Sequence, residues 1–329
     1  MEEGITIVLD SNEILSGVCG VNDQNLKVIA GSLGGRIRTR GNEISLTGVD
    51  ESGRRRFKTV IDSLILAVRE GEYPSTEYVE ALAGAFLAPP SGADEAGFPG
   101  GSLSGDPLRD NLIQIPQGFG KVFPRTWNQA LYIQGMRSRD ISFCAGPAGT
   151  GKTYLAVAEA LRLVLSKKIR KLVLTRPVVE AGESLGYLPG DLAQKINPYL
   201  RPLYDAMEAL VPYEAIRRME DTRSIEVAPL AYMRGRSLND SVVILDEAQN
   251  TTREQMKMFL TRIGQGPRAV ITGDTTQIDL PKRQDSGLLH ALSLLSKVEG
   301  IHITYLNTGD VVRNPLVKKI IEAYDAEKN

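Results

Sequence analysis

One octapeptide matches the phosphate-binding pattern GxxxxGK(S/T) at every position: Gly146, Pro147, Ala148, Gly149, Thr150, Gly151, Lys152 and Thr153. Glycines in such a loop let backbone N–H groups turn inward onto phosphate oxygens. The helix that follows, predicted over 154–165, points its positive end at the same place. In this pattern Lys152 reaches the β- and γ-phosphates, and the Thr153 hydroxyl binds Mg²⁺. The segment therefore predicts a nucleotide site.

Two carboxylates, Asp246 and Glu247, end a later apolar strand over 241–246. We expect Asp246 at the carboxyl edge of the sheet beside the phosphate loop, where it would hold Mg²⁺ through water. Glu247 would polarise the attacking water as general base. The alternative is a strand followed by an N-capping aspartate. A second acid after the metal-binding one favours hydrolysis over phosphoryl transfer to a small molecule, because a kinase must exclude water.

Two further residues are candidates for contact with the γ-phosphate. Gln277 follows the strand predicted over 268–272, and it is placed to reach that phosphate or the attacking water. Arg313 follows the last strand, where it would stabilise charge on the γ-phosphate in its own subunit or in a neighbouring one. A solvent-facing amide and a surface arginine are the respective alternatives. The predicted catalytic set is Lys152, Glu247, Gln277 and Arg313.

The second part of the chain alternates apolar runs with helical patterns. Continuous apolar runs are typical of strands buried on both faces of a parallel sheet, and their alternation with helices predicts a doubly wound α/β domain. The candidate strands are 141–145, 171–175, 225–229, 241–246, 268–272 and 301–306.

A linker precedes this domain. Eleven of the nineteen residues over 88–106 are Gly, Pro or Ser, a composition that buries too little apolar surface to fold. The predicted organisation is a small domain over 1–85, a flexible linker over 86–115 and an ATPase-type domain over 116–329.

The small domain resembles a KH-type RNA-binding domain. Its predicted order is strand, helix, helix, strand, strand, helix, and Gly17 and Gly20 stand where such domains carry a GxxG loop that clamps single-stranded RNA. The residues between these glycines are Val18 and Cys19 rather than basic or polar ones. A packing or oligomerisation module is the alternative.

Two basic clusters lie in the same domain. Arg36, Arg38 and Arg40 alternate along a predicted strand, and a second cluster lies over 54–58 at the start of the last helix. These side chains are candidates for RNA contact, and the alternative is that they form solvated faces.

Composition excludes several classes of protein. The 329 residues carry 39 Lys and Arg against 40 Asp and Glu, so a globally polybasic nucleic-acid coat protein is excluded. No apolar run approaches the length of a transmembrane helix, and the acidic start Met1-Glu2-Glu3 is unlike a secretory leader. The two cysteines and two histidines lack zinc-site spacing. We expect a cytoplasmic protein without structural metal.

The whole chain resembles the PhoH family of ATPases. The resemblance is carried by GPAGTGKT together with five other segments: 124–133, 174–192, 233–250, 271–281 and 310–317. The core is also similar to superfamily 1 helicase motors, which carry Asp-Glu-x-Gln, here Asp246, Glu247 and Gln249, and Gly-Asp-x-x-Gln, here Gly273, Asp274 and Gln277. The implied fold is a P-loop NTPase of the RecA or superfamily 1 kind: a parallel sheet flanked by helices, with a small α+β KH-like domain before it.

The resemblance implies roles for residues outside the phosphate loop. Gln129 matches the glutamine that reads the adenine edge, which implies ATP over GTP. Thr175, Arg176 and Glu183 match positions that contact nucleic acid or couple it to ATP. For Arg176 and Glu183, a salt-bridged structural role is the alternative. Arg234 and Arg236 are assigned to phosphates of RNA, or of ATP across a subunit interface.

The resemblance also implies partners. Helicases close two motor domains over ATP, whereas this chain has one, so we expect a homo-oligomeric ring of the hexameric kind in which each subunit completes its neighbour's site. Implied partners are single-stranded RNA and a YbeY-type endoribonuclease. The expected function is ATP hydrolysis with Mg²⁺ coupled to RNA binding, remodelling or unwinding. The alternative is a nucleotide-gated adaptor that recruits an RNA nuclease or a ribosome-maturation partner.

Overall fold

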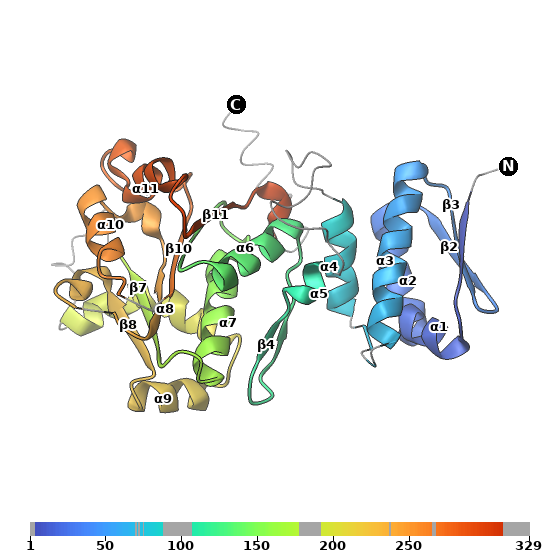
Figure 1. Ribbon diagram of the computed structural model, residues 1–329, viewed down its shortest axis with the longest axis horizontal. Helices are drawn as coiled ribbons and strands as arrows, with labels where there is room; N and C mark the ends of the chain where they lie inside the picture. Colours follow the sequence, from blue (N-terminus) through green and yellow to red (C-terminus); the bar gives the residue numbers. More distant parts are fainter. Residues whose placement is uncertain are drawn as a thin grey trace. The chain divides into compact units, whose positions relative to one another are not determined.

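The structure is a computed structural model that describes residues 4–69, 71, 73–74, 76–87, 107–177, 192–236, 238–264 and 268–311. The chain divides into two compact units (Figure 1). The first consists of residues 1–112 and 123–130, and the second consists of residues 113–122 and 131–329. None of the helices in the described ranges is both long and apolar enough to cross a membrane.

The first unit has the predicted order of strand, helix, helix, strand, strand, helix. Its elements are β1 (Ile5–Val8), α1 (Asn12–Cys19), α2 (Gln24–Leu33), β2 (Arg36–Arg40), β3 (Glu43–Thr47) and α3 (Glu51–Arg69), followed by α4 (Thr76–Leu87) and α5 (Pro107–Asp110). The strands form an antiparallel sheet in the order β1-β3-β2. Helices α1 to α3 lie on one side of it (Figure 1), because alternate residues such as Ile44 and Leu46 point into their shared core.

The predicted linker is wrong at both of its ends. Residues 86–87 belong to α4, and residues 107–115 contain α5 and strand β4 (Ile113–Ile115). Leu108 and Ile113 are fully buried, so this stretch carries apolar anchors that a composition count over 88–106 does not register. Residues 88–106 themselves lie outside the described ranges.

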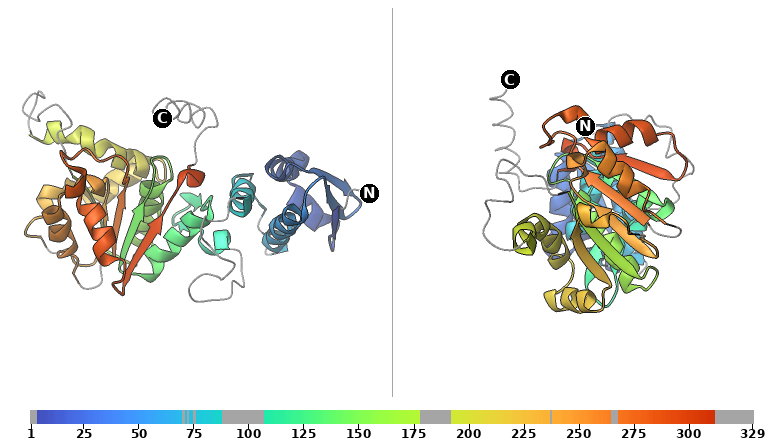
Figure 2. Two further views of the ribbon diagram at one scale, coloured as in Figure 1. Left: turned by 90° about the horizontal axis from the view of Figure 1, so that it is seen from above. Right: turned by 90° about the vertical axis from the view of Figure 1, so that its left-hand side faces the viewer.

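The second unit is built on a six-stranded parallel sheet in the order β11-β6-β10-β9-β7-β8 (Figure 2). The strands are β6 (Ile141–Ala145), β7 (Lys171–Arg176), β8 (Ile225–Pro229), β9 (Ser241–Leu245), β10 (Arg268–Gly273) and β11 (Ile301–Tyr305). The helices are α6 (Trp127–Ser138), α7 (Lys152–Leu165), α8 (Leu192–Glu208), α9 (Tyr213–Asp221), α10 (Arg253–Leu260) and α11 (Gly287–Leu295); α6 begins in the first unit. Strand β4 pairs with β5 (Gly120–Val122) in a separate hairpin. This confirms the predicted α/β class.

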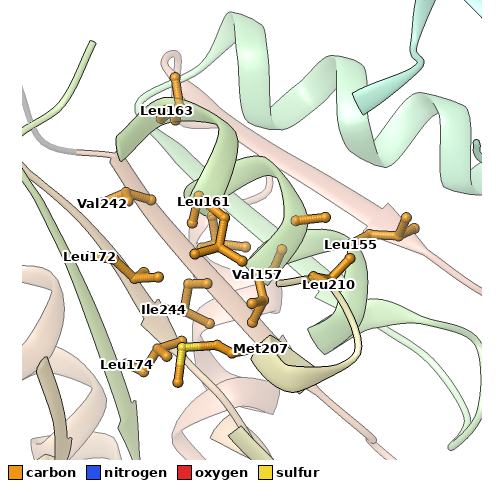
Figure 3. Close-up of a cluster of buried hydrophobic side chains, with 14 of the residues drawn as sticks. Leu155, Val157, Leu161, Leu163, Leu172, Leu174, Met207, Leu210, Val242 and Ile244 are labelled. Atoms are coloured by element: carbon orange, nitrogen blue, oxygen red, sulfur yellow. The ribbon is translucent and has the colours of Figure 1, made fainter. Parts of the chain in front are cut away.

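Both faces of the large sheet are buried. On one face, Leu172, Leu174, Val242 and Ile244 pack against α7 and α8 (Figure 3). Their neighbours along the strands, such as Val243, point to the opposite face and pack with residues of α10 and α11. Two buried faces require apolar residues at successive positions, which is why these strands appear in the sequence as continuous apolar runs.

The strand order decides which loops meet. Strand β10 pairs with both β6 and β9, although β9 and β10 lie far beyond β6 in the sequence. The loops that follow these three strands therefore meet at one edge of the sheet, the usual place for ligand sites in open α/β sheets.

Candidate functional site

The loop between β6 and α7 depends on its glycines. Gly149 and Gly151 both have φ of 80°, a left-handed conformation that favours glycine. A Cβ atom on Gly146 would lie 2.5 Å from the Leu306 carbonyl oxygen of the neighbouring strand end. Thr150 closes the loop from within, because its hydroxyl donates to the Pro147 carbonyl at 2.8 Å. The loop thus has the backbone shape that a phosphate cradle needs.

Lys152 lies at the first position of α7 and is only 9% exposed. Its ammonium donates to the carbonyl oxygens of Gly146 and Pro147, both at 2.7 Å. Burial lowers the pKa of Lys152, while nearby groups, including the carboxylates Asp274 and Asp246, act in the opposite direction. The cation is therefore held inside the loop and faced by negative charge.

Asp246 receives two hydroxyl hydrogen bonds. Thr153 Oγ1 and Thr272 Oγ1 each donate to its Oδ1 atom at 2.7 Å. Asp246 is 5% exposed and comes directly after β9, whereas Thr153 is in α7 and Thr272 is in β10. Three elements thus fix this carboxylate beside the phosphate loop, where its position was predicted.

Glu247 has a left-handed backbone with φ of 51° and is half-buried. Its Oε1 atom lies 3.1 Å from Arg176 Nη2, and its Oε2 atom accepts from Gln249 Nε2 at 2.5 Å. Arg176 also donates to the Tyr199 carbonyl at 3.3 Å. Both carboxylate oxygens are therefore oriented by donors. Of the two roles considered for Arg176, this arrangement is the ion-paired one.

Gln249 links Glu247 to the end of β10. Its side-chain oxygen accepts from the Asp274 backbone N–H at 3.0 Å. Asp274 Oδ1 accepts from the backbone and the hydroxyl of Thr276, at 2.8 and 2.6 Å. Asp274 Oδ2 is buried without a hydrogen-bond partner in the described part of the chain. An unsatisfied buried carboxylate oxygen calls for a ligand or an ion.

These groups surround a cleft of about 270 Å³. The predicted residues on its walls are Ala148, Gly149, Gly151, Lys152, Thr153, Asp246, Glu247 and Gln277. Gly146, Pro147 and Thr150 complete the loop behind them. Gln277 is exposed, and its backbone N–H donates to the Asp274 carbonyl at 3.3 Å. The predicted phosphate-binding, metal-binding and general-base residues thus share one cleft.

The donor set fits a nucleotide that brings its own Mg²⁺. Mg²⁺ prefers oxygen ligands and is usually held by one or two carboxylates together with substrate phosphates. The Thr153–Asp246 pair and the unpartnered oxygen of Asp274 offer such ligands. Within the described ranges, no three His, Cys, Asp or Glu side chains form a metal cage by themselves.

Several sequence-predicted residues lie away from this cleft. Arg236 donates to both oxygens of Glu226 at 2.5 and 2.9 Å, and Lys171 contacts the same carboxylate. These cations lower the pKa of Glu226 to about 2, with the Arg236 hydrogen bonds the largest cause. Arg234 is exposed. The phosphate contacts predicted for Arg234 and Arg236 stay predictions, and Arg236 would have to leave an ion pair to make them.

Three other predictions are not settled by the geometry. Gln129 belongs to the first unit, where its side-chain oxygen accepts from the Arg125 backbone at 2.6 Å, so adenine recognition stays a prediction. Glu183 and Arg313 lie outside the described residues.

The GxxG segment differs from the expected loop. Gly17, Val18 and Cys19 are buried inside α1, and a Cβ atom on Gly17 would lie 2.7 Å from Val68 Cγ2. The connection between α1 and α2 instead begins at Gly20, which has φ of 70°. The prediction of a loop from Gly17 is therefore wrong, because this glycine allows two helices to pack closely.

Sequence reasoning gave no site role to four residues at or near the cleft. Tyr154 and Asp274 line it, Gln249 orients Glu247, and Thr272 binds Asp246. Asp274 and Gln249 lie inside the matched Gly-Asp-x-x-Gln and Asp-Glu-x-Gln segments, so a signal was present. Thr272 could not be found in this way, because only strand pairing brings it to Asp246.

Comparisons with known proteins agree with this geometry. Residues 121–325 match a family model described as PhoH, PhoH-like protein. The chain is similar to a PhoH-like protein of Bacillus subtilis (strain 168), with 45% identity over 309 residues that cover 94% of this chain and 93% of the relative. It is 41% identical over 329 residues to a PhoH-like protein of Synechocystis sp. (strain ATCC 27184 / PCC 6803 / Kazusa), covering 98% and 95%. It is 40% identical over 205 residues to Protein PhoH of Escherichia coli (strain K12), covering 62% and 58%.

Proposed function

The chain belongs to the PhoH-like family, whose members are generally ATP-binding, and on this premise we propose that it hydrolyses ATP with Mg²⁺ in a reaction coupled to RNA binding. The observation that carries the proposal is the position of Glu247. Its carboxylate lines the same cleft as Lys152 and Asp246, and both of its oxygens are oriented by hydrogen-bond donors. A protein that only binds nucleotide does not require an oriented base beside the phosphate loop.

Each residue of the cleft has a role in this reaction. The loop N–H groups and Lys152 bind the phosphates, and Lys152 exchanges its two carbonyl acceptors for phosphate oxygens. Thr153 and Asp246 would hold an Mg²⁺ that accompanies ATP, and such an ion would supply neutralisation of the phosphate charge. Glu247 takes a proton from the attacking water. Arg176 and Gln249 keep its carboxylate in one orientation, and Gln277 is placed at the cleft wall to contact the water or the γ-phosphate.

Coupling to RNA is supported by the KH-like element order of the first unit and by the position of Arg176. Arg176 ends β7 and contacts the general base, so a change in its surroundings would reach the catalytic carboxylate directly. We extend the proposal to a homo-oligomer in which Arg313 acts on a neighbouring site.

A second candidate is nucleotide-gated assembly, in which ATP occupancy controls recruitment of an RNA nuclease or ribosomal partner. The observation in its favour is the burial of Gly17, Val18 and Cys19 inside α1. A KH domain that grips RNA through its GxxG segment would need that segment exposed.

Steady-state ATP hydrolysis with and without single-stranded RNA tests both candidates. RNA should raise the rate several-fold, and Glu247→Gln should lower kcat by about 100- to 10,000-fold while ATP still binds. Glu214→Gln, which makes the same chemical change at an exposed position of α9, should retain wild-type activity. Normal turnover by Glu247→Gln would refute the proposed base. Slow hydrolysis that RNA does not change would favour nucleotide-gated assembly.

A further inference from the structure

Three arginines of the first unit point to the same side of one strand. Arg36, Arg38 and Arg40 alternate along β2, and all three are exposed. Between them Ile37 packs against the helical core. Since side chains of a strand alternate between its two faces, the arginines lie on the face turned away from α1, α2 and α3.

The paired strands add hydroxyl groups to this face. In the register of the sheet, Arg38 lies opposite Ser45, and Arg36 lies opposite Thr47. Ser45 in turn pairs with Thr6 of β1, and both point to the same side as the arginines. No described element of the first unit covers this face in Figure 1. We call this face, defined by Arg36, Arg38, Arg40, Ser45 and Thr47, the arginine face.

The charge of the arginine face is not neutralised within the described residues. None of its arginines forms an ion pair or a side-chain hydrogen bond there, although Arg40 lies opposite Glu43. The basic cluster at the start of α3 differs. Arg55 pairs with Glu51, and Lys58 pairs with Asp62 at 2.7 Å. In the same cluster, Arg56 donates to the Ser52 hydroxyl at 2.7 Å. The guanidinium groups of the arginine face, by contrast, have no side-chain partner among the described residues.

The spacing of these arginines suits a regular polyanion. Alternate residues of a strand are separated by about 7 Å, which is comparable with the distance between successive phosphates of an extended single strand. Guanidinium groups bind phosphate oxygens in bidentate fashion, and neighbouring hydroxyls can donate to the same backbone. The arginine face carries no aromatic side chain, so base stacking would add little and binding would be independent of sequence.

Protection of a sheet edge is the other reading of this pattern. Strand β2 is an edge strand, and charged residues discourage edge-to-edge pairing. A single charged residue in the strand is enough to discourage edge-to-edge pairing. Three arginines at successive alternate positions exceed this need and form a row of positive charge. Edge protection also predicts a different result of substitution. If it were the role of the arginines, variants with neutral residues in their place would self-associate, and their affinity for RNA would not change.

We propose that the arginine face binds the phosphate backbone of single-stranded RNA through Arg36, Arg38 and Arg40. The proposal rests on the proposed coupling of ATP hydrolysis to RNA. It places the contact on the open face of the sheet rather than on the buried Gly17–Cys19 segment or on the ion-paired start of α3.

The test measures binding of a fluorescent oligouridylate of about 12 nucleotides to the full chain by fluorescence anisotropy over a range of salt concentrations. The variant combines Arg36→Gln, Arg38→Gln and Arg40→Gln. Loss of three phosphate contacts should weaken binding roughly 10- to 100-fold near 0.1 M salt and reduce the slope of log K against log salt by about 2. The matched control combines Arg55→Gln, Arg56→Gln and Lys58→Gln, which remove the same charge and should retain the affinity.

Each other outcome overturns the proposal. Equal losses in both triple variants would show that net charge matters and not a site. Wild-type affinity in the β2 variant, with or without new self-association, would leave edge protection as the role of the row. A wild-type chain that binds no oligouridylate would refute RNA coupling as well. If the wild-type protein binds RNA and both triple variants bind it equally well, the arginine face is refuted as the binding site, while the proposed coupling to RNA is not. ATP hydrolysis without RNA should be unchanged in both variants, because their substitutions lie in the first unit and the cleft lies in the second. Far-UV circular dichroism and thermal unfolding that match the wild type verify that the first unit is folded.

Discussion

The two glycine motifs that the sequence associates with phosphate contact have opposite environments. In the second unit, Gly149 and Gly151 adopt φ of 80° in a loop at the mouth of a cleft. In the first unit, Gly17 is helical, and its missing side chain allows α1 to approach Val68 of α3. The first motif uses the conformational freedom of glycine, whereas the second uses its small size. A glycine pattern therefore predicts a phosphate site only where the backbone is free to turn.

The arginines of the two units differ in whether they have carboxylate partners. In the second unit, Arg176 and Arg236 are paired with Glu247 and Glu226. In the first unit, the arginines of β2 have no carboxylate partner among the described residues. In the function proposed above, the second unit binds phosphate through loop N–H groups and Lys152, whereas Arg176 and Arg236 are engaged with carboxylates. The first unit offers arginines whose charge is still available to a ligand.

The largest expected effect concerns the carboxylate at the centre of the cleft. Asp246→Asn removes the charge that accepts from Thr153 and Thr272, so the metal-binding pair should fail. We expect kcat for ATP hydrolysis to fall at least 100-fold, a loss of about 2.7 kcal/mol of transition-state stabilisation. Steady-state hydrolysis at saturating Mg²⁺ measures it. Asp240→Asn, at the opposite end of β9, is the matched control and should be active. Wild-type activity of Asp246→Asn would refute the assignment of Asp246 as a metal-binding residue of the ATP site.

A second prediction tests whether Arg236 has a structural role. The pKa of Glu226 is depressed to about 2, so its ion pairs stabilise the fold above the unfolded-state pKa near 4.5, and this stability is lost as pH falls toward 2. Glu226→Gln should therefore cost about 1–3 kcal/mol at pH 7 after allowance for partial exposure. The difference from wild type should shrink between pH 4.5 and 2. Urea denaturation followed by circular dichroism at several pH values measures this difference.

The activity of the same variant sharpens the contrast between arginines. Glu226→Gln should hydrolyse ATP and bind RNA as the wild type does, because Arg236 is engaged with a carboxylate and not with phosphate. A specific loss of RNA binding or turnover, with stability maintained, would return Arg236 to the phosphate-contacting group.

A third prediction separates the two uses of glycine. Gly17→Ala should destabilise the first unit by about 1–3 kcal/mol, because the added methyl group would overlap Val68. Gly31→Ala, in the neighbouring helix α2, meets no atom within 4 Å and should stabilise by about 0.5–1 kcal/mol. Thermal unfolding measures both. If Gly17→Ala left stability unchanged and weakened RNA binding, the clamp interpretation of this glycine would be restored.

The smallest effect is expected at the residue that orients the base. Arg176→Ala removes one of the two donors to Glu247 and should lower kcat about tenfold, or about 1.4 kcal/mol, with little change in KM. Arg176→Lys should recover part of the loss, because a single charged donor still reaches the carboxylate. A raised KM with normal kcat would instead indicate direct contact between Arg176 and nucleotide.

Local patterns were sufficient for the large sheet. The six predicted strands of the second unit match the observed ones to within one residue at each end. Strands buried on both faces are apolar throughout, so their runs are visible in the sequence without reference to partners. The helix α4 and the hairpin of β4 and β5 were not predicted, since they are short or adjoin the Gly- and Pro-rich segment and carry little periodic signal of their own.

The candidate site divides in the same way. The phosphate loop and the Asp246–Glu247 pair were predictable, because each is contiguous and its chemistry depends on residue types at fixed spacing. The contact between Glu247 and Arg176 was not, because Arg176 reaches Glu247 from the end of another strand, β7. Gln249 lies two residues beyond Glu247 in the same motif, but its contact with Glu247 was seen only in the structure. The linker boundary and the Gly17 loop were predicted wrongly, since both depend on burial against distant side chains.

The sequence by itself determined the fold class, the nucleotide loop and the acid pair, since these follow from local hydrophobic periodicity and from contiguous motifs. Only the tertiary structure decided which charges are engaged. The strand order brings Thr272 to Asp246, and the end of β7 brings Arg176 to Glu247. The antiparallel register of the first unit brings Thr47 and Ser45 beside Arg36 and Arg38 on one face of the sheet. Hydrogen bonds and ion pairs act only over a few ångströms, so residues distant in sequence acquire or lose partners only when the chain has folded.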